Sequence, residues 1–413
     1  MFIRLASKSL LNRKGSVLLT VMAMAVSIFV LLGVEHIRHQ TKDSFSSTVS
    51  GVDLIVGART GNLNLLLYSV FRIGSPTNNI SWDTYQALSS NKRVAWAVPI
   101  SLGDSHKGYR VMGTSTGYFE HFRYGKKRPL EFAQGVPFSN VFDVVLGAEV
   151  AKRLGYKLDD QLVLAHGIAA TSFSLHDDRP FKVSGILKPT GTPVDQTLHI
   201  SLQGIEAIHI DWKQGVKQPG SHLNVDQLGA MELEPKNITA FMLGLNSKLA
   251  TFRVQREINH YRNEPLTAIL PGVALSELWQ MMGLLENTLR LISALVLVAA
   301  LLGLCAMMLA SIREREQEIH LLRVIGARPF YLFLLIELEA LLIAFVSILL
   351  GLAGLYGTLL AAGPALASSF GLHIGLNILS GNNALFLLVY LGATTLAAMI
   401  PSITAYRNAK SSQ

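Results

Sequence analysis

The sequence predicts a membrane protein with four transmembrane α-helices, one N-terminal and three C-terminal, and a large α+β extracytoplasmic domain between helices 1 and 2. Two observations predict this class: four long segments lack Asp, Glu, Lys and Arg, and the basic residues are unevenly placed between them. Only 15% of the 413 residues are charged, against about 25% in soluble domains. The single cysteine excludes an intramolecular disulfide framework and a multi-cysteine metal site.

The charge-free segments are each 19 to 23 residues long: 16–34, 291–311, 340–362 and 384–405. About 20 apolar residues span a ~30 Å hydrocarbon core as a helix. The first segment is longer than the apolar core of a signal peptide, and no small-residue cleavage site follows it, so we expect it to be retained. We therefore place transmembrane helices at 16–35, 281–311 (with a stalk), 330–362 and 384–406.

Lys and Arg residues mark the cytoplasmic side of a membrane protein. They gather in the amphipathic N-terminus 1–15, the segment 312–329 and the tail 407–413, whereas 363–383 has none. We therefore expect both termini and 312–329 in the cytoplasm, with 36–280 and the short loop 363–383 in the periplasm. The segment 36–280 holds 25 basic and 21 acidic residues. The net charge of +8 thus reflects orientation, and we exclude nucleic acid as a partner.

The periplasmic segment alternates between strand and helix patterns. Strands are predicted at 52–56, 94–100, 143–146, 161–165, 181–187, 198–202 and 239–245, and helices at 82–89, 148–154, 204–212 and 248–261. Ser81 is the expected N-cap of the first helix. Both ends of the segment, 35–49 and 275–290, are expected to continue the membrane helices as a helical stalk.

The cytoplasmic segment 312–329 is predicted to form a short amphipathic helix. Its polar face mixes three Glu with three Arg, and its apolar residues recur near helical spacing. Gly326 suits the end of that helix, and Pro329 suits the start of the next one. Such a helix could lie on lipid headgroups, but an anionic membrane would favour Lys and Arg over this mixture. We therefore expect it to bind a protein partner.

Two chemical alternatives remain open. Residues 113–117 satisfy the Gly-x-Ser-x-Gly pattern around Ser115, which would make the protein a membrane-anchored hydrolase, although a plain turn is favoured. Ten of the twelve histidines lie in 36–280, including His176 beside Asp177 and Asp178, and histidines with carboxylates can bind zinc. We expect most of them to be solvated surface residues. No Gly-x-x-x-x-Gly-Lys-Ser/Thr loop is present, so ATP would have to be used by a partner.

Residues 315–327 resemble the Arg-Glu-x-Glu-Ile-x-x-Leu-Arg-Ala-x-Gly-Ala stretch of FtsX/MacB-type (type VII, LolC/LolE-like) ABC transporter permeases, with Val324 where Ala is usual. Residues 145–155, 181–194 and 401–409 resemble further motifs of that family, and Glu339 stands at its transmembrane Glu. The resemblance implies a non-catalytic subunit in a bacterial inner membrane. It also implies a dimer, with the same or a related permease, bound to cytoplasmic ABC ATPase subunits that hold ATP-Mg. No cofactor, catalytic residue or metal ligand is expected in this chain.

The resemblance further implies that 312–326 is the coupling helix that binds the ATPase. Ile319, Leu322 and Ile325 would enter its groove, and Gly326 would end the helix. Glu316, Glu318 and Arg323 would fix the register through rim ion pairs. ATP-driven closure would then move the periplasmic domain, which is called mechanotransmission, in export, in extraction of lipoprotein or lipid, or in periplasmic signalling. A periplasmic or lipoprotein partner would fit these roles.

Glu339 lies about one turn inside the third membrane helix, where a carboxylate needs a partner. Arg328 or another helix of the bundle is expected to supply it, and Arg290 is expected to extend to the outer membrane interface. Residues 51–58 resemble a subgroup of these permeases found near zinc-responsive genes, so a permease of a zinc-linked uptake system is the main alternative. A receptor without an ATPase is a further one.

Overall fold

The computed structural model describes residues 2–46, 48, 50–167, 179–210, 212–213, 216–217, 231, 233–314, 328–370, 375–379 and 383–411. The chain forms two compact units. We call residues 1–41, 282–367 and 374–413 the membrane unit, and residues 42–281 with 368–373 the outer unit.

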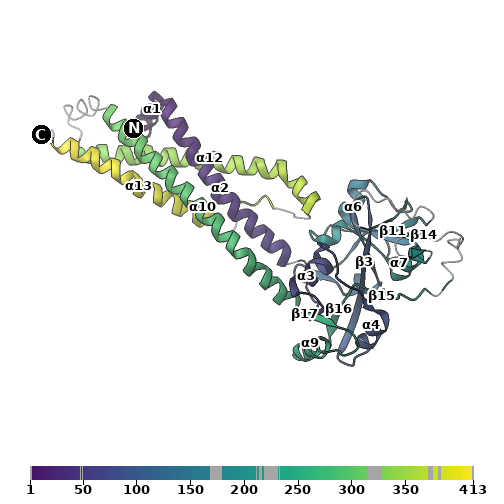
Figure 1. The fold of residues 1–413 in the computed structure, drawn as a ribbon. Coiled ribbons are helices and arrows are strands. Elements are labelled where there is room, and N and C mark those ends of the chain that lie inside the picture. The colour runs from purple at the N-terminus through teal and green to yellow at the C-terminus, as the bar shows by residue number, and fades with distance from the viewer. Residues whose placement is uncertain are drawn as a thin grey trace. The chain divides into compact units, whose positions relative to one another are not determined.

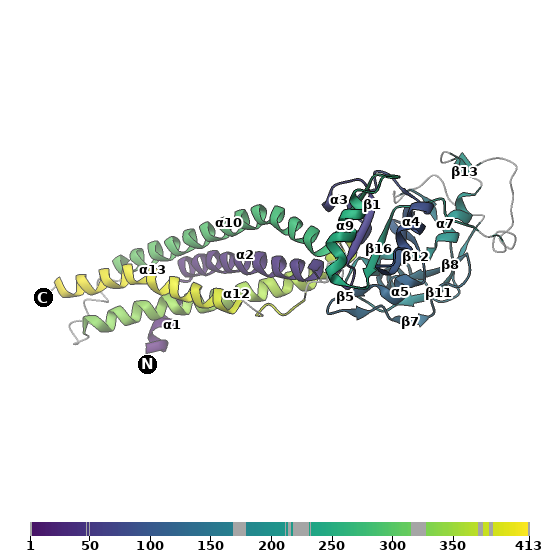
Figure 2. The same ribbon diagram turned by 90° about the horizontal axis from the view of Figure 1, so that it is seen from below.

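The membrane unit holds most of each of the long helices, which run side by side there (Figures 1 and 2). They are α2 (Lys14–Ser46), α10 (Pro271–Glu314), α12 (Pro329–Phe370) and α13 (Asn383–Ser411), preceded by the short α1 (Phe2–Asn12). Each of the four long helices carries a stretch long and apolar enough to cross a membrane. The predicted arrangement of one N-terminal and three C-terminal membrane helices is confirmed.

Helices α2 and α12 pack closely against each other in this unit. The backbone of Gly351 on α12 lies so near α2 that an added Cβ would be 2.9 Å from the carbonyl oxygen of Ala25. Four residues earlier on α12, the Ser347 hydroxyl donates to the carbonyl of Val21 at 3.2 Å. Small residues allow such close contact between membrane helices. By contrast, only 22% of the apolar window of α10, and of α13, is buried.

Two of the long helices extend beyond their membrane-spanning segments. The third membrane span was predicted at 330–362, and the apolar span of α12 covers Pro329–Gly363, while the helix itself continues to Phe370. The sequence 361–367 contains Gly363 and Pro364, which commonly end helices in water. Membrane helices tolerate both residues, and the alanines around them favour the helix. Helix α10 begins at Pro271, so it includes the stretch 275–290 that the sequence predicts as a helical stalk.

The outer unit contains a mixed sheet that is described with eleven strands. Nine of them form the order β17 (Leu266–Ile269), β1 (Leu54–Ala58), β16 (Ala240–Leu245), β3 (Val94–His106), β4 (Tyr109–Thr114), β12 (Thr197–Ser201), β8 (Asp143–Leu146), β11 (Phe181–Leu187) and β7 (Phe132–Gly135). The short β10 (Ala165–His166) pairs with β3, and β9 (Gln161–Leu162) pairs with β11. The pairs β4–β12 and β8–β11 are parallel, and the other strand pairs are antiparallel.

Smaller elements complete the outer unit. Two-stranded pairs are β2 (Ile80–Ser81) with β15 (Asn237–Ile238), β5 (Arg123–Tyr124) with β6 (Arg128–Pro129), and β13 (Trp212–Lys213) with β14 (Val216–Lys217). The helices are α3 (Asn62–Leu66), η1 (Leu67–Phe71), α4 (Trp82–Ser89), α5 (Gly117–His121), α6 (Ala148–Leu154), η2 (Pro193–Gln196), α7 (Leu202–His209), η3 (Lys248–Ala250) and α9 (Thr251–Asn259). Strands β8 and β11 and helices α4 and α6 have the bounds that the sequence predicts.

Strand β1 shows why the sheet is covered on both faces. Successive side chains of a strand point to opposite faces. Ile55 therefore packs with η1 and with Val98 and Met112, whereas its neighbours on β1 pack with α9. All five residues of β1 are buried. The sheet thus separates two apolar layers, and helices lie over each of them.

The first and last strands of the outer unit are neighbours. Strand β1 pairs with β17 in antiparallel register, with Val56 opposite Ala268. The chain comes to β1 from α2 and leaves β17 directly into α10, because Pro271 begins that helix two residues after β17 ends. Both connections of the outer unit to the membrane helices therefore leave from one edge of the sheet.

Candidate functional site

A buried carboxylate lies in the half of the membrane unit near the N-terminus of α2. Glu339 on α12 is 3% exposed, and the hydroxyl of Ser9 on α1 donates to its Oε1 at 2.6 Å. The guanidinium of Arg13 is 3.7 Å from its Oε2 and donates to the Ser9 hydroxyl at 3.3 Å. A charge in a membrane helix is costly unless it is paired. The N-terminal segment supplies the partners here, and they belong to the same bundle.

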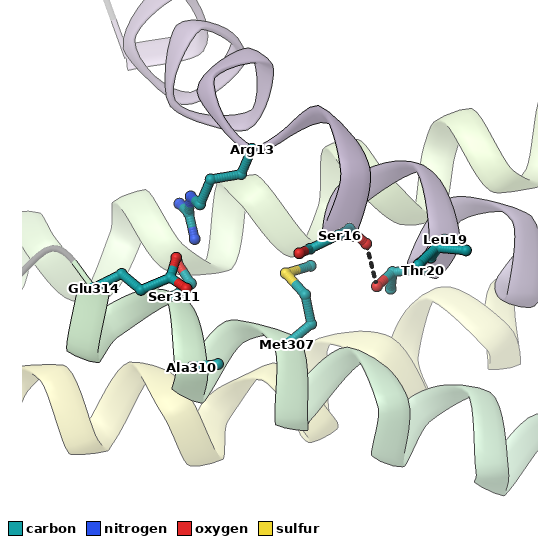
Figure 3. Close-up of a pocket in the computed structure, with 8 residues that line it drawn as sticks. All are labelled: Arg13, Ser16, Leu19, Thr20, Met307, Ala310, Ser311 and Glu314. Atoms are coloured by element: carbon teal, nitrogen blue, oxygen red, sulfur yellow. Dashed lines mark hydrogen bonds between the residues drawn. The ribbon is translucent and has the colours of Figure 1, made fainter.

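Arg13 lies at the junction of α1 and α2, where the chain changes direction (Figure 2). Its side chain also borders a cavity of about 250 Å³ between α2 and α10. The other lining residues are Ser16, Leu19, Thr20, Met307, Ala310, Ser311 and Glu314. Figure 3 shows Arg13 directed toward Glu314, the last residue of α10. Arg13 therefore lies between the end of α10 and the carboxylate of α12.

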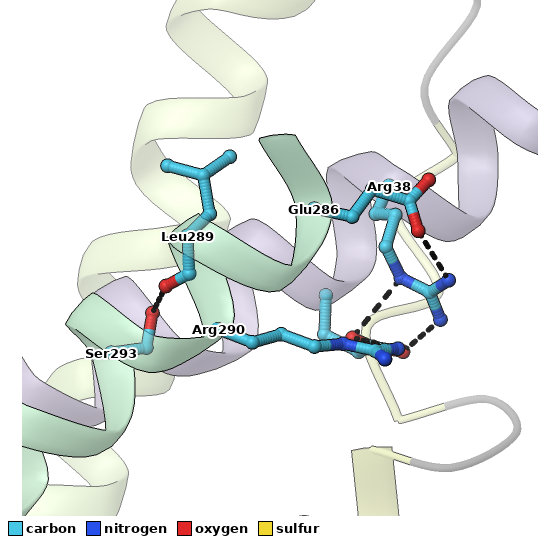
Figure 4. A network of polar contacts seen from close by, with 6 residues as sticks. Arg38, Glu286, Leu289, Arg290 and Ser293 are labelled. Carbon is cyan, nitrogen blue, oxygen red and sulfur yellow. Dashed lines mark hydrogen bonds and ion pairs between the residues drawn. The ribbon is translucent and has the colours of Figure 1, made fainter. Parts of the chain in front are cut away.

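A second charged cluster joins α2 to α10 (Figure 4). Glu35 is 5% exposed and accepts from Arg38 at 2.5 Å and 3.2 Å. Arg38 also pairs with Glu286 at 3.2 Å, and Arg290 reaches Glu35 at 3.4 Å. Two acids and two bases make the cluster neutral, which reduces the cost of burying it. Arg290 on α10, which was predicted to extend to the outer membrane interface, pairs with Glu35 on α2.

Glu337 is a buried group that the sequence interpretation did not select. It is 7% exposed and lies on α12, two residues before Glu339. Residues two apart on a helix do not share a face. Glu337 therefore points away from the Arg13 cluster. In the sequence, only its closeness to Glu339 could have indicated that Glu337 is buried.

The predicted ATPase-coupling residues lie outside the described residues. This applies to Glu316, Glu318, Ile319, Leu322, Arg323, Ile325 and Gly326. Their flanks are described: α10 ends at Glu314 and α12 begins at Pro329. The segment therefore joins the ends of two membrane helices directly.

The Gly-x-Ser-x-Gly motif lies between β4 and the five-residue helix α5. Ser115 is half-buried in the turn that follows β4. Within the described part of the chain, no hydrogen bond from Ser115 to a histidine is found, and the nearby His121 stacks on Trp96 with centroids 4.8 Å apart. A nucleophilic serine needs a base within hydrogen-bond reach. This geometry gives the hydrolase alternative no support.

Three of the histidines predicted to be solvated are buried instead, so that expectation is wrong for them. His36, His106 and His199 are 2%, 5% and 0% exposed. Burial lowers the pKa of His199 to about 3, helped by the positive charge of Arg72. Burial also lowers the pKa of His106, whose ring nitrogens contact the Val163 carbonyl at 2.6 Å and the Tyr156 hydroxyl at 2.9 Å.

Two other histidines gather around one carboxylate. Nδ1 of His166 and Nε2 of His209 are 3.0 Å apart, and each faces Oδ1 of Asp104. The three residues come from β10, α7 and β3. His176 and His222 lie outside the described residues.

Comparison with protein families decides the class. The family described as MacB-like periplasmic core domain matches residues 17–259, which is more than half of the chain. The chain belongs to the FtsX/MacB-type ABC transporter permeases. The family described as FtsX-like permease C-terminal matches residues 290–410 of this permease, which hold its last three membrane helices. Permeases of this family work with ATPase partners. No curated protein matches the sequence.

Two solved structures are similar to part of the permease. The periplasmic region of MacB from Actinobacillus actinomycetemcomitans is 10% identical, with a TM-score of 0.34, and the match covers 56% of this chain and 94% of that one. The extracellular domain of the noncanonic ABC-type transporter YknZ from Gram-positive bacteria is 10% identical, with a TM-score of 0.31, covering 53% and 98%. The four apolar helices and the match to the periplasmic core domain family make the permease a multi-pass membrane protein with an extracellular domain.

Proposed function

We propose that this permease is a non-catalytic subunit that transmits ATP-driven movement to its periplasmic domain. In this proposal a separate cytoplasmic ATPase binds ATP-Mg and contacts the segment 312–326. Both termini are cytoplasmic, and the protein lies in a bacterial inner membrane. The work done is export, extraction of a lipoprotein or lipid, or periplasmic signalling.

One observation carries the proposal: α10 is a continuous helix from the last strand of the outer unit to the proposed coupling segment. Its 44 residues correspond to about 66 Å, roughly twice the hydrocarbon thickness of a membrane. A helix without a break resists bending better than a loop does. A displacement at Glu314 would therefore reach the strand β17, which ends two residues before α10 begins.

The charged clusters support a switch between discrete states. The cluster of Glu35, Arg38, Glu286 and Arg290 holds α2 against α10, while Arg13 and Glu339 hold the N-terminal segment against α12. Ion pairs of this kind can exchange partners as packed helices slide, so a packed bundle can have two arrangements. Nucleotide binding by the partner would bias one of them.

A second permease copy, identical or related, completes the proposed complex. Helix α10 supports this because it exposes a series of large apolar side chains, among them Leu284, Leu285, Leu291, Leu295 and Leu302. Lipid covers some of this surface, and a facing helix from the second copy would cover the rest. Cysteine cross-linking at Leu295 in native membranes tests the pairing.

The decisive experiment measures ATPase binding by the full-length permease. In the proposal Ile319, Leu322 and Ile325 enter the ATPase groove, with Glu316, Glu318 and Arg323 at its rim. Ile319→Asp should abolish co-purification of the ATPase, because a buried aspartate in an apolar groove is strongly unfavourable. Leu11→Asp is the matched control, since Leu11 is 60% exposed on the predicted cytoplasmic side. An intact complex with Ile319→Asp contradicts the docking role.

A second experiment separates docking from transmission. Gly-Gly inserted after Gly283 should interrupt α10 while leaving the coupling segment intact. We expect the ATPase to bind and hydrolyse ATP normally, and the nucleotide-dependent change in a periplasmic distance, measured by spin labels, to disappear. If that distance change survives the insertion, α10 is not the transmitting element.

A further inference from the structure

Three ligating side chains meet on the outer unit, away from the membrane helices in sequence. Asp104 lies on β3, and His166 is its direct cross-strand partner on β10. His209 is the last residue of α7, which follows β12. Nδ1 of His166 is 3.3 Å from Oδ1 of Asp104, Nε2 of His209 is 3.4 Å from the same oxygen, and the two nitrogens are 3.0 Å apart.

These three atoms form a nearly equilateral triangle, which is the arrangement of ligands around one ion. Zinc binds histidine nitrogen at about 2.0–2.1 Å, so neighbouring ligands of a tetrahedral zinc lie about 3.3–3.4 Å apart. A point equidistant from the three atoms in their plane is about 1.9 Å from each. An ion slightly above that plane would therefore meet all three at normal bond lengths without movement of the backbone.

A neighbouring carbonyl group holds His209 in a tautomer that can bind a metal ion. Nδ1 of His209 is 2.8 Å from the carbonyl oxygen of Ile205, which can only accept, so Nδ1 carries the hydrogen. Nε2 then presents its lone pair to the triangle. Metal-binding histidines commonly donate their second N–H to a backbone carbonyl in this way. The ring planes of His166 and His209 are inclined by 74°, so their two nitrogens meet without stacking of the rings.

The carboxylate of this cluster is buried, and its two histidines are partly exposed. The Asp104 side chain is 1% exposed, whereas those of His166 and His209 are 43% and 27% exposed. A buried carboxylate favours a cation beside it, because burial removes most of the solvation of its charge. The exposed histidine edges leave one side open to solvent. Three protein ligands with an open fourth position suit an ion that is exchanged or transferred.

We propose that Asp104, His166 and His209 form a zinc-binding site on the periplasmic domain. Two imidazoles and one carboxylate suit Zn²⁺ better than Mg²⁺ or Ca²⁺, which prefer oxygen ligands. The site does not depend on the proposed ATPase coupling, since none of its residues lies near a membrane helix in sequence. It places a metal-responsive position on the domain that the membrane helices would move.

The test uses the full-length permease in detergent, stripped with a chelator and titrated with Zn²⁺. We expect one Zn²⁺ per chain by calorimetry, and at least a tenfold weaker affinity in His166→Gln and in His209→Gln. His260→Gln is the matched control, because His260 is an exposed histidine whose Nδ1 also contacts a helix carbonyl, that of Arg256 at 2.9 Å. Its affinity should equal that of the unchanged protein.

Two further measurements keep the outcome clear. Without metal, His166→Gln and the unchanged protein should unfold at similar temperatures, because the His166 side chain is partly exposed. With Zn²⁺, only the unchanged protein should unfold at a higher temperature. Co²⁺ should give the visible absorption of a four-coordinate ion in the unchanged protein and lose it in the variants. Failure of the unchanged protein to bind Zn²⁺ stoichiometrically, or equal affinity in His166→Gln, overturns the proposal.

Discussion

Replacing Gly351 by alanine tests the contact between α2 and α12. The new Cβ would lie 2.9 Å from the carbonyl oxygen of Ala25 and 3.0 Å from Ile28, whereas ordinary contacts are 3.4–4 Å. The helices would have to separate by about 0.5 Å or more. Separation would lengthen the Ser347 hydrogen bond to the Val21 carbonyl, now 3.2 Å. Overpacking of this kind costs about 1–3 kcal/mol.

The same substitution at Gly357 provides the control. Gly357 lies on the same helix, and nothing is within 4 Å of the position that its Cβ would take. Alanine is favoured over glycine in helices by up to about 1 kcal/mol, and this gain applies at both positions. The difference between the two variants therefore isolates the steric cost. We expect Gly351→Ala to be less stable than Gly357→Ala by about 1–3 kcal/mol.

Equilibrium unfolding of both variants in mixed detergent micelles measures this difference directly. Cysteine pairs placed across α2 and α12 should also cross-link more slowly in Gly351→Ala. Equal stability of the two variants, with equal cross-linking, would refute the close contact of these helices and the role given to small residues in their packing.

Three other substitutions test single interactions by thermal unfolding of the full-length chain. Arg13→Gln should destabilise by about 1–3 kcal/mol, because the buried carboxylate of Glu339 loses its cation; Arg13→Lys should recover part of the loss. Ser81→Ala should cost about 1 kcal/mol, because the Ser81 hydroxyl caps α4 by accepting from the backbone N–H of Thr84; no change would show that the cap is dispensable. Because the folded pKa of His199 is about 3 and the unfolded value about 6.5, the unfolded state takes up the proton first as pH falls. Stability should therefore decrease below pH 6.5 by up to about 1.4 kcal/mol per pH unit, and His199→Phe should remove this part of the pH dependence.

The membrane helices could be predicted because their signal is local. A run without charges identifies each helix without knowledge of its neighbours, and the basic residues around it suggest its orientation. Segments 143–146 and 181–187 were found as strands because their patterns are also local: 144–146 is an apolar run, and Phe181 and Val183 alternate with polar residues. The continuation of α12 past Gly363 and Pro364 to Phe370 was not predicted, because both residues commonly end helices in water.

The contacts between distant residues could not be predicted. Glu339 was recognised as a carboxylate in need of a partner, but Ser9 lies 330 positions away in the sequence, and no spacing rule connects them. The same is true of Asp104, His166 and His209, which only the pairing of β3 with β10 and the position of α7 bring together. Sequence spacing favoured His176 with its two aspartates, because adjacency is the only proximity that a sequence shows.

Because β1 pairs with β17, the two ends of the periplasmic domain lie next to each other, and the domain could be exchanged as one unit. Paired strands lie about 4.8 Å apart, so the chain enters and leaves the sheet at nearly the same point. A different domain with adjacent terminal strands could replace this one without altering the length or order of the four membrane helices. Residues 54–269 could therefore be exchanged as one piece, and the helices on either side would keep their order along the chain.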